Sequence, residues 1–312
     1  MGRSAHEARV NSVGADDTDA LAERSWLAMS ADLYQQLPAS RHGYVDCVGD
    51  IETLRLHHLD HGDSSDAGDR APMVLIHGVC GHAGAWSAVA TALASTMRPI
   101  AVDLRGHGAS QWSATHDYAT TTHAADVLGV LDALDLDRVS LVGSSWGALI
   151  ALAVAVAQPD RVDRLVLVDI EPSFEQSETD VAPRPHAFTS AAEVFAFERG
   201  RNPNAPDRVL AAVAAASVRP GPGGLVPWFD PYFYDRWPHR RDDWWDALAT
   251  VLTPTLVVHA AQSFVRREVT ERMAQLLANG DHVEIGSSTH VVPVDAPAAL
   301  VAVLRTFFER SP

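Results

Sequence analysis

The stretch VSLVGSSWGALIAL, residues 139–152, decides the fold of this chain. Its centre, residues 143–147, reads GSSWG and fits the pattern G-x-S-x-G. The apolar run before it is typical of a buried strand, and the small apolar residues after it are typical of a helix. A serine between such a strand and helix lies on a sharp turn with its hydroxyl exposed above the sheet. This context favours Ser145 as a nucleophile over a structural turn serine, and Ser144 is expected to face away.

Strand and helix patterns alternate on both sides of this stretch. Two runs, at 41–47 and 52–59, alternate well enough to form an antiparallel pair. Short apolar runs that are typical of buried parallel strands occur at 73–78, 98–104, 164–170 and 253–260. Segments with helical spacing separate them. The alternation predicts an α/β fold with a mostly parallel central sheet and helices on both faces.

The alternation breaks between residues 173 and 250, which are rich in Pro, Ala and Arg and then in aromatic residues. Because it resumes afterwards, residues 173–250 are predicted to form a cap inserted into one core. That core comprises residues 40–172 and 251–312. Residues 1–39 are expected to be an N-terminal extension with one helix, since residues 19–37 have helical spacing.

The composition excludes some classes of partner. A net charge of -16 argues against nucleic acid, which clustered Lys and Arg bind. No apolar run reaches the roughly 18 residues of a membrane span, and the first residues lack a signal peptide's apolar segment. Two cysteines, Cys47 and Cys80, are too few for a disulfide framework. We therefore expect a cytoplasmic protein with no nucleic-acid or membrane partner. A homo-oligomer is compatible with these features.

A nucleophilic serine needs a base, and 15 histidines compete for that role. His290 stands out because it follows the apolar strand HVEI and precedes the final helix, in the loop GSSTHVVPVDAP. We expect His290 to be the base. The alternative is an ordinary histidine of a surface loop.

From about residue 40 onward the chain resembles enzymes of the α/β-hydrolase fold superfamily. The segments VLIHGVCGHAGAW, VDLRGHGAS, LVGSSWGALIALAVAVAQPDRV and STHVVPVDAP carry the resemblance. It implies the α/β-hydrolase fold and a chain order with the nucleophile first and the histidine last. It also implies an oxyanion hole made by the backbone N–H groups of Val79 and Trp146, which would hold the charge that develops on a carbonyl oxygen. Asp103 and Arg105 are expected to brace a turn.

The position of the catalytic acid departs from the common pattern. Many relatives carry it after the strand at 253–260, but residues 260–265 read AAQSFV and hold no carboxylate. Asp169 and Glu171 follow the preceding strand, as in some relatives that include the zearalenone lactonases. A carboxylate orients the imidazole and stabilises the imidazolium, so the acid is sought there. Strand register favours Asp169. Glu171 is the alternative acid, and a site without a functional acid is the third interpretation.

Other patterns point to cofactors less strongly. Gly78, Gly81 and Gly84 imitate a dinucleotide-binding unit, but their G-x-x-G-x-x-G spacing suits an oxyanion loop better. HHLDHGD, residues 57–63, has metal-ligand composition. Adjacent histidines on a strand point to opposite faces, so a solvated strand end is expected instead. Cys80 has no visible base beside it and is expected to be an inert thiol. Neither a metal nor an organic cofactor is expected.

The cap contains more aromatic residues than its own core needs. We expect four of them, Trp228, Trp237, Trp244 and Trp245, to contact a hydrophobic small-molecule substrate; the alternative is that they only join cap to core. The sequence thus predicts a serine hydrolase that cleaves a carboxylic ester or lactone through an acyl-enzyme. A tryptophan directly after the nucleophile, here Trp146, is also a feature of proline iminopeptidases, so amide cleavage is an alternative. Because the loop after the strand at 253–260 lacks an acid, a non-catalytic ligand-binding homologue is a further alternative.

Overall fold

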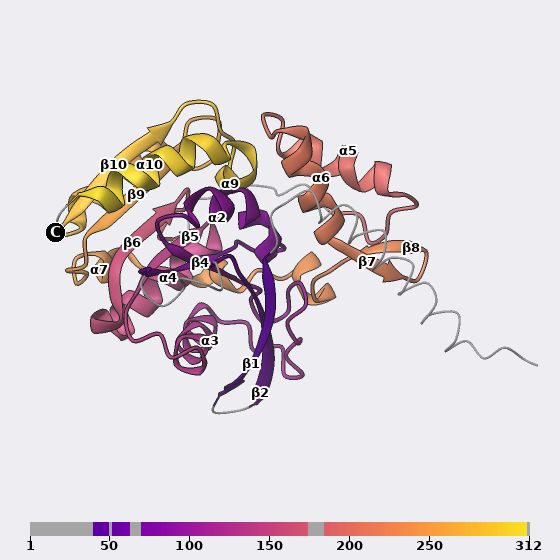
Figure 1. The fold of residues 1–312 in the computed structure, drawn as a ribbon, viewed down its shortest axis with the longest axis horizontal. Helices are drawn as coiled ribbons and strands as arrows, with labels where there is room; N and C mark the ends of the chain where they lie inside the picture. The colour runs from indigo at the N-terminus through magenta and orange to yellow at the C-terminus, as the bar shows by residue number, and fades with distance from the viewer. Residues whose placement is uncertain (1–39, 50–51, 63–69, 174–183, 311–312) are drawn as a thin grey trace, which may run out of the picture.

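The computed structural model of the chain describes residues 40–49, 52–62, 70–173 and 184–310. The expected N-terminal extension, with its helix at 19–37, lies outside these residues. Eight strands form the central sheet (Figure 1): β1 (Arg41–Val48), β2 (Thr53–Asp60), β3 (Pro72–Ile76), β4 (Arg98–Val102), β5 (Val139–Ser144), β6 (Val162–Val168), β9 (Thr255–Ala260) and β10 (Gly280–Ile285). Their order across the sheet is β1-β2-β4-β3-β5-β6-β9-β10.

The pairing of the strands follows the sequence pattern. β1 and β2 form an antiparallel pair, and β2 also runs antiparallel to β4. From β4 onward in the order across the sheet, each strand is parallel to the next. The predicted mostly parallel sheet is therefore confirmed. Because parallel strands end at one edge, the loops after β3, β5, β6, β9 and β10 emerge together.

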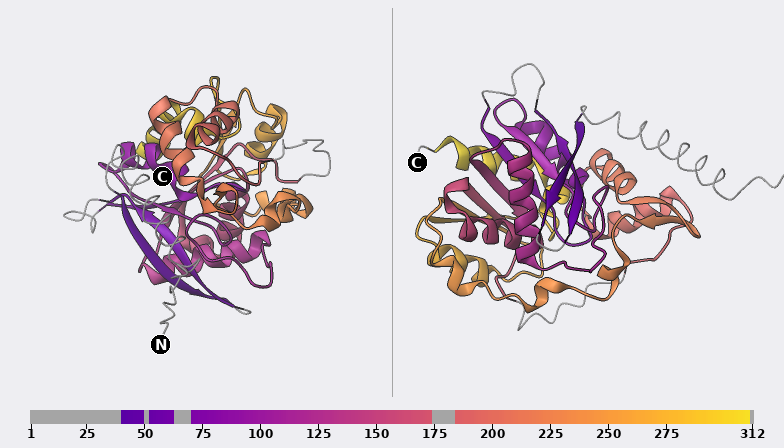
Figure 2. Two further views of the ribbon diagram at one scale, coloured as in Figure 1. Left: turned by 90° about the vertical axis from the view of Figure 1, so that its right-hand side faces the viewer. Right: turned by 90° about the horizontal axis from the view of Figure 1, so that it is seen from below.

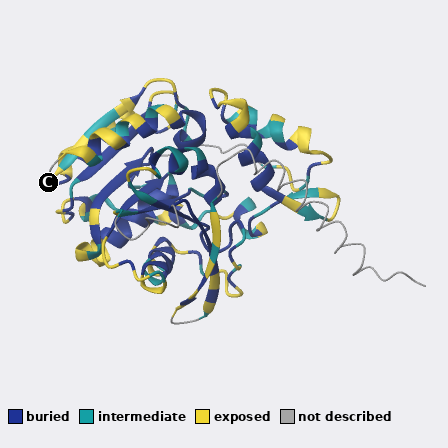
Figure 3. Cartoon of the chain, viewed as in Figure 1, coloured by how far each residue is buried: buried dark blue, intermediate teal, exposed yellow. Residues whose placement is uncertain are grey.

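Helices cover both faces of the sheet. One face is covered by α3 (Thr120–Ala133), α4 (Trp146–Ala157) and α8 (Arg267–Leu276), which share an apolar core with the sheet. The other face is covered by α2 (Ser87–Leu93) and α10 (Pro297–Glu309). Figure 3 shows the strands buried between these layers, with exposed residues on the outer sides of the helices. The sequence of α4 is almost wholly apolar because it lies buried beside the sheet.

Between β6 and β9 the chain leaves the sheet and forms the segment predicted as a cap. It contains α5 (Ala191–Arg201), α6 (Asp207–Ala216), the hairpin of β7 (Val218–Gly221) and β8 (Gly224–Pro227), and the short helices η3 (Pro231–Tyr234), η4 (Pro238–Arg241) and α7 (Trp245–Leu248). Figures 1 and 2 show α5, α6 and the hairpin grouped to one side of the sheet. Two short side-chain hydrogen bonds tie this segment to the core, from Tyr118 to Asp230 and from Thr120 to Asp242.

The prediction that residues 57–63 form a solvated strand end is wrong. His57, His58, Asp60 and His61 are all buried, because β2 lies inside the sheet between β1 and β4. Nδ1 of His57 pairs with Asp103 at 2.7 Å. Among the described residues, no group of three or more His, Cys, Asp or Glu side chains is arranged to hold a metal ion. In the same part of the chain, no helix is long and apolar enough to cross a membrane.

Candidate active site

Ser145 lies on a sharp turn between the end of β5 and the start of α4. Its φ of 55° and ψ of -130° lie in a region that L-residues rarely adopt, and strain of this kind gathers at functional sites. The glycines around it allow the turn to form. A Cβ on Gly143 would lie 2.1 Å from the carbonyl oxygen of Gly147, and one on Gly147 would lie 2.3 Å from that of Ile76. The G-x-S-x-G pattern thus reflects close packing of β3, β5 and α4.

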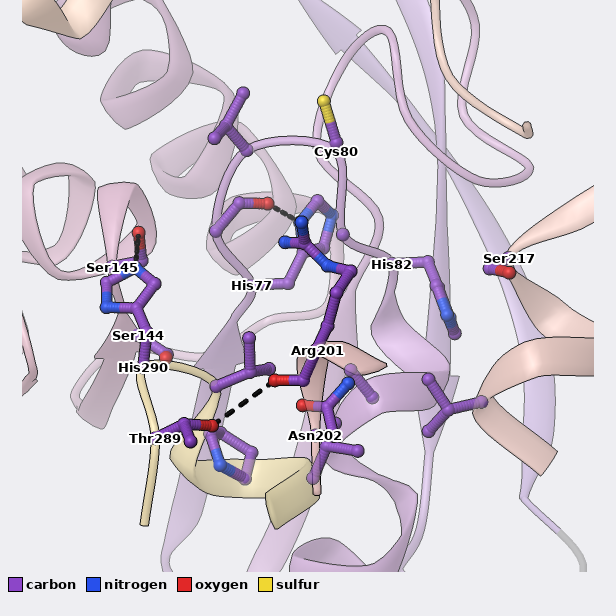
Figure 4. Close-up of a pocket in the computed structure, with 18 of the residues that line it drawn as sticks. His77, Cys80, His82, Ser144, Ser145, Arg201, Asn202, Ser217, Thr289 and His290 are labelled. Carbon is purple, nitrogen blue, oxygen red and sulfur yellow. Dashed lines mark hydrogen bonds between the residues drawn. The ribbon is translucent and has the colours of Figure 1, made fainter. Parts of the chain in front are cut away.

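Three loops from the same sheet edge bring a serine, a histidine and a carboxylate together. Oγ of Ser145 lies 2.8 Å from Nε2 of His290, which follows β10 (Figure 4). Nδ1 of His290 lies 2.7 Å from Oδ2 of Asp169, the residue directly after β6. This is the geometry of a nucleophile, a base and an acid that orients the base.

The carboxylate of Asp169 is fully buried, with 0% of the residue exposed. Its Oδ1 accepts a hydrogen bond from the backbone N–H of Ala260 at 2.8 Å. Its Oδ2 accepts a short hydrogen bond from the hydroxyl of Ser263 in addition to the one from His290. Donors of this kind stabilise the ionised carboxylate, which the imidazolium of a working triad requires.

Glu171, the alternative acid, points elsewhere. Its carboxylate accepts from Nε of Arg266 at 3.4 Å and from the backbone N–H of the same residue at 3.5 Å. Arg266 precedes α8, so Glu171 ties the loop after β6 to the start of that helix. Of the two sequence candidates, the structure places Asp169 against the imidazole.

The loop after β3 presents the N–H expected to form one side of the oxyanion hole. The carbonyl of Gly78 accepts from Nδ1 of His77 at 2.7 Å and from the N–H of Gly81 at 3.0 Å. Because the peptide bond is planar and trans, the N–H of Val79 points to the opposite side. The N–H of Trp146 begins α4, where helical N–H groups lack intrahelical acceptors. Within the described residues neither N–H donates a hydrogen bond, so both are available to a ligand.

Two buried histidines that sequence reasoning did not single out support this loop. Nε2 of His77 accepts from the N–H of Leu104 at 3.1 Å, and Nε2 of His107 accepts from the N–H of Cys80 at 3.1 Å. Burial lowers the pKa of His77 to about 4, and it also lowers the pKa of His107, so both rings are neutral at pH 7. A neutral ring can accept at one nitrogen and donate at the other, as both do here.

Asp103 and Arg105 act as braces, in agreement with the sequence analysis. Asp103 accepts from the backbone N–H groups of Ala83 and Ala109, at 2.6 and 3.0 Å. It thereby joins the far end of the oxyanion loop to the turn after β4. The guanidinium of Arg105 pairs with Asp126 of α3 through two nitrogens.

Asp295 is a third residue that the sequence analysis missed, although it lies in the quoted segment STHVVPVDAP. Its carboxylate accepts from the N–H of Thr289 at 2.8 Å and from the N–H of Asn204 at 2.7 Å. Thr289 precedes His290, and Asn204 joins α5 to α6. Asp295 therefore connects the cap to the loop that carries the histidine.

A cavity of about 390 Å³ opens over Ser145. Val79 and His290 also line it, and its wall on the cap side combines aromatic with charged and polar side chains. The aromatic part of that wall comprises Phe229, Phe233, Tyr234 and Trp237. Cys80 lines the cavity as well, and burial raises the pKa of its thiol to about 11. A neutral thiol at pH 7 agrees with the expected inert role.

Of the four cap tryptophans expected to contact a substrate, one lines the cavity. Trp237 lines the cavity, whereas Trp228, Trp244 and Trp245 lie outside its lining. Trp244 packs against the core on the side of α4, and Nε1 of Trp245 donates to Ser173 at 3.0 Å. The carbonyl of Trp228 accepts from Gly108 at 2.7 Å. These three lie where the cap meets or rejoins the core, so they join the two parts, as the alternative interpretation held.

Comparison with known proteins places the chain in a family. A family model described as alpha/beta hydrolase fold matches residues 71–218. The 2-hydroxy-6-oxo-2,4-heptadienoate hydrolase of Pseudomonas putida is 30% identical over 282 residues, which are 85% of this chain and 95% of that protein. The 2-(acetamidomethylene)succinate hydrolase of Mesorhizobium japonicum is 26% identical, over 76% of this chain and 87% of that protein.

Solved structures share the fold. The structure of an E-2-(acetamidomethylene)succinate hydrolase superposes with a TM-score of 0.73 at 22% identity, over 87% of this chain and 100% of that one. A thioesterase domain from the curacin biosynthetic pathway gives a TM-score of 0.72 at 24% identity, over 86% of this chain and 99% of that one. The chain belongs to the α/β-hydrolase fold family, and its similarity to these named hydrolases supports a hydrolase activity.

Proposed function

We propose that this chain is a serine hydrolase that cleaves a carboxylic ester or lactone of a hydrophobic small molecule through an acyl-enzyme. The observation that carries the proposal is the continuous chain of contacts from Ser145 through His290 to Asp169, at 2.8 and 2.7 Å. A hydroxyl becomes a nucleophile when a neighbouring base accepts its proton, and the base needs a third group that fixes its tautomer.

The proposed reaction has two halves. Oγ of Ser145 bonds to the carbonyl carbon while Nε2 of His290 takes the hydroxyl proton, and the N–H groups of Val79 and Trp146 hold the oxyanion. The tetrahedral intermediate collapses, the C–O bond breaks, and the proton passes from His290 to the leaving alcohol. Water then attacks the acyl-enzyme by the same route and releases the acid. With a lactone the alcohol stays attached to the acyl group.

The walls of the cavity support a hydrophobic substrate. A space of about 390 Å³ with four cap aromatics on one side suits a small molecule with an apolar body. The relatives' names specify other substrates, a 2-hydroxy-6-oxo-2,4-heptadienoate and a 2-(acetamidomethylene)succinate. A test panel therefore includes an oxo acid and an amide beside esters and lactones.

Replacing Ser145 tests the proposal. Ser145→Ala is expected to lower kcat by about 10⁴- to 10⁶-fold on 4-nitrophenyl butyrate or a δ-lactone, because the attacking atom is removed. Folding should persist, which circular dichroism would show. Ser144→Ala is the matched control, since it removes a neighbouring hydroxyl that makes no hydrogen bond to His290. Hydrolysis by Ser145→Ala at the wild-type rate would refute the assignment. So would equal labelling of the wild type and Ser145→Ala by a fluorophosphonate.

A further inference from the structure

Positive charge gathers in the cavity of an acidic protein. The chain carries a net charge of -16, yet three arginines line the cavity: Arg184, Arg201 and Arg240. Among the described lining residues, Glu198 is the single carboxylate. The cavity wall therefore has an excess of positive charge, unlike the chain as a whole.

Arg184 and Arg201 differ in their partners. Nη1 of Arg184 donates to Glu198 at 3.2 Å, and its guanidinium lies over the ring of Phe229. Arg201, by contrast, makes no side-chain hydrogen bond or ion pair within the described residues; its guanidinium contacts the ring of Phe197 at 5.8 Å. Among the described residues, the single lining carboxylate thus forms its ion pair with Arg184 and none with Arg201.

The surroundings of Arg201 disfavour its charge. Burial and the neighbouring Arg184 lower the pKa of its guanidinium to about 10, although the charge of Glu198 acts in the opposite direction. The side chain stays protonated at pH 7. Removing an ion from water costs free energy, and no carboxylate of the described residues forms an ion pair with Arg201 to offset that cost.

Arg201 lies within reach of the same cavity as the nucleophile. Figure 4 shows its side chain between Ser145 and His290 on one side and His82 and Ser217 on the other. Its backbone is held in place, because its carbonyl accepts from Oγ1 of Thr289 at 3.3 Å. The guanidinium is therefore presented from a fixed position at the end of α5, next to the loop that carries His290.

We propose that Arg201 binds a carboxylate of the substrate. This proposal rests on the proposed function. It means that the ester or lactone attacked by Ser145 also carries an ionised carboxylate away from its scissile carbonyl. A guanidinium presents paired N–H donors that match the two oxygens of a carboxylate. The aromatic cap wall would contact the apolar body between the two groups. The competing role is structural, since a cation at the last residue of a helix also interacts favourably with the helix dipole.

Kinetics on paired esters test the proposal. One pair places the carboxylate on the acyl side: 4-nitrophenyl hydrogen glutarate against 4-nitrophenyl pentanoate. The other places it on the alcohol side: 4-carboxyphenyl acetate against phenyl acetate. In at least one pair, Arg201→Gln should lower the ratio of kcat/KM for the anionic ester to that for the neutral ester by about 10- to 100-fold, mainly through KM. Arg201→Lys keeps the charge but loses the paired N–H donors, so its ratio should lie between those of the wild type and Arg201→Gln.

Arg208→Gln is the matched control. Arg208 lies exposed on α6 in the same cap, so its replacement removes the same charge away from the cavity. Its anionic-to-neutral ratio should equal that of the wild type. A ratio lowered equally by both variants would mean that long-range charge, and not contact, governs the preference, and would overturn the proposal.

A binding measurement separates this proposal from the proposed function. In a Ser145→Ala background, calorimetry compares 3-phenylpropionate with 3-phenylpropanol. Adding Arg201→Gln should raise the Kd of the carboxylate about 10- to 100-fold and that of the alcohol far less. Equal changes for both, together with a lower thermal midpoint, would assign Arg201 the structural role at the end of α5. If Ser145→Ala hydrolyses esters like the wild type, the proposed function fails while this comparison still decides the role of Arg201.

Discussion

The loops after β6 and β9 leave the same sheet edge side by side, yet they contribute different groups to the site. The loop after β6 supplies the carboxylate, Asp169, which lies 2.7 Å from the imidazole. The loop after β9 supplies what surrounds that carboxylate. The N–H of Ala260 and the hydroxyl of Ser263 donate to it, and the ring of Phe264 packs on His290 at 4.3 Å.

The difference shows that the acid's position along the chain is less important than its position in space. Parallel strands that end at one edge bring successive loops within a side chain's length of the same imidazole. A carboxylate from either loop can then occupy one spot, provided that the other loop solvates it. A triad is recognised by geometry and not by sequence position. In this chain the loop after β9 contributes Ser263, which donates to the carboxylate from the loop after β6.

Removing the carboxylate from the loop after β6 should have the largest effect on this comparison. Asp169→Asn keeps the size of the side chain but favours the wrong tautomer of His290. We expect kcat on the best ester substrate to fall by up to about 10⁴-fold at neutral pH. Steady-state kinetics would measure the loss, and a thermal midpoint would show that the variant still folds.

Glu171→Gln is the control for that variant, since Glu171 pairs with Arg266 and not with the histidine. It should change kcat by less than about threefold, because the Glu171 carboxylate does not contact the imidazole. The opposite pattern, with a mild Asp169→Asn and an inactive Glu171→Gln, would transfer the role of the acid to Glu171. Wild-type activity in both variants would indicate that Ser145 and His290 act without an acid.

Exchanging the two residues should recover part of the lost activity. Asp169→Ser alone leaves the imidazole without its carboxylate, whereas the double variant with Ser263→Asp returns one from the loop after β9. Because Oγ of Ser263 already contacts the oxygen that pairs with His290, we expect kcat about 10- to 100-fold above that of Asp169→Ser. Placing the new carboxylate at the neighbouring position instead, with Gln262→Asp, should recover nothing. Equal activity in the two double variants would show that the two loops are not interchangeable.

The sequence predicts those parts of the site that backbone constraints encode. Gly143 and Gly147 mark the turn at Ser145 because no Cβ fits there. The place of His290 follows from the last strand and helix. Asp169 emerges by elimination, since the loop after β9 lacks a carboxylate, and the choice over Glu171 rests on strand register alone.

The parts that the sequence does not predict depend on tertiary contacts. Whether a cap tryptophan lines the cavity or joins the core depends on how short helices turn, and aromatic composition is the same in both cases. The burial of His57 depends on β2 lying inside the sheet, and the support from His77 and His107 depends on neutral tautomers. Side-chain direction at these positions follows packing partners that lie far along the chain.

Of the changes to residues in contact with the triad, removing the hydroxyl of Ser263 should have the smallest effect. Ser263→Ala deletes one of the donors to Asp169, while the N–H of Ala260 and the imidazole remain. A hydrogen bond to a charged group contributes roughly 1.5–3 kcal/mol, but most of that loss should appear in stability, because the carboxylate is equally buried before and during the reaction. We therefore expect a thermal midpoint lower by several degrees and kcat lower by about 3- to 10-fold. Ser263→Thr keeps the donor and should behave like the wild type in both measurements. A loss in Ser263→Ala as large as that in Asp169→Asn would mean that the hydroxyl shares the role of the acid, and the difference between the two loops would no longer hold.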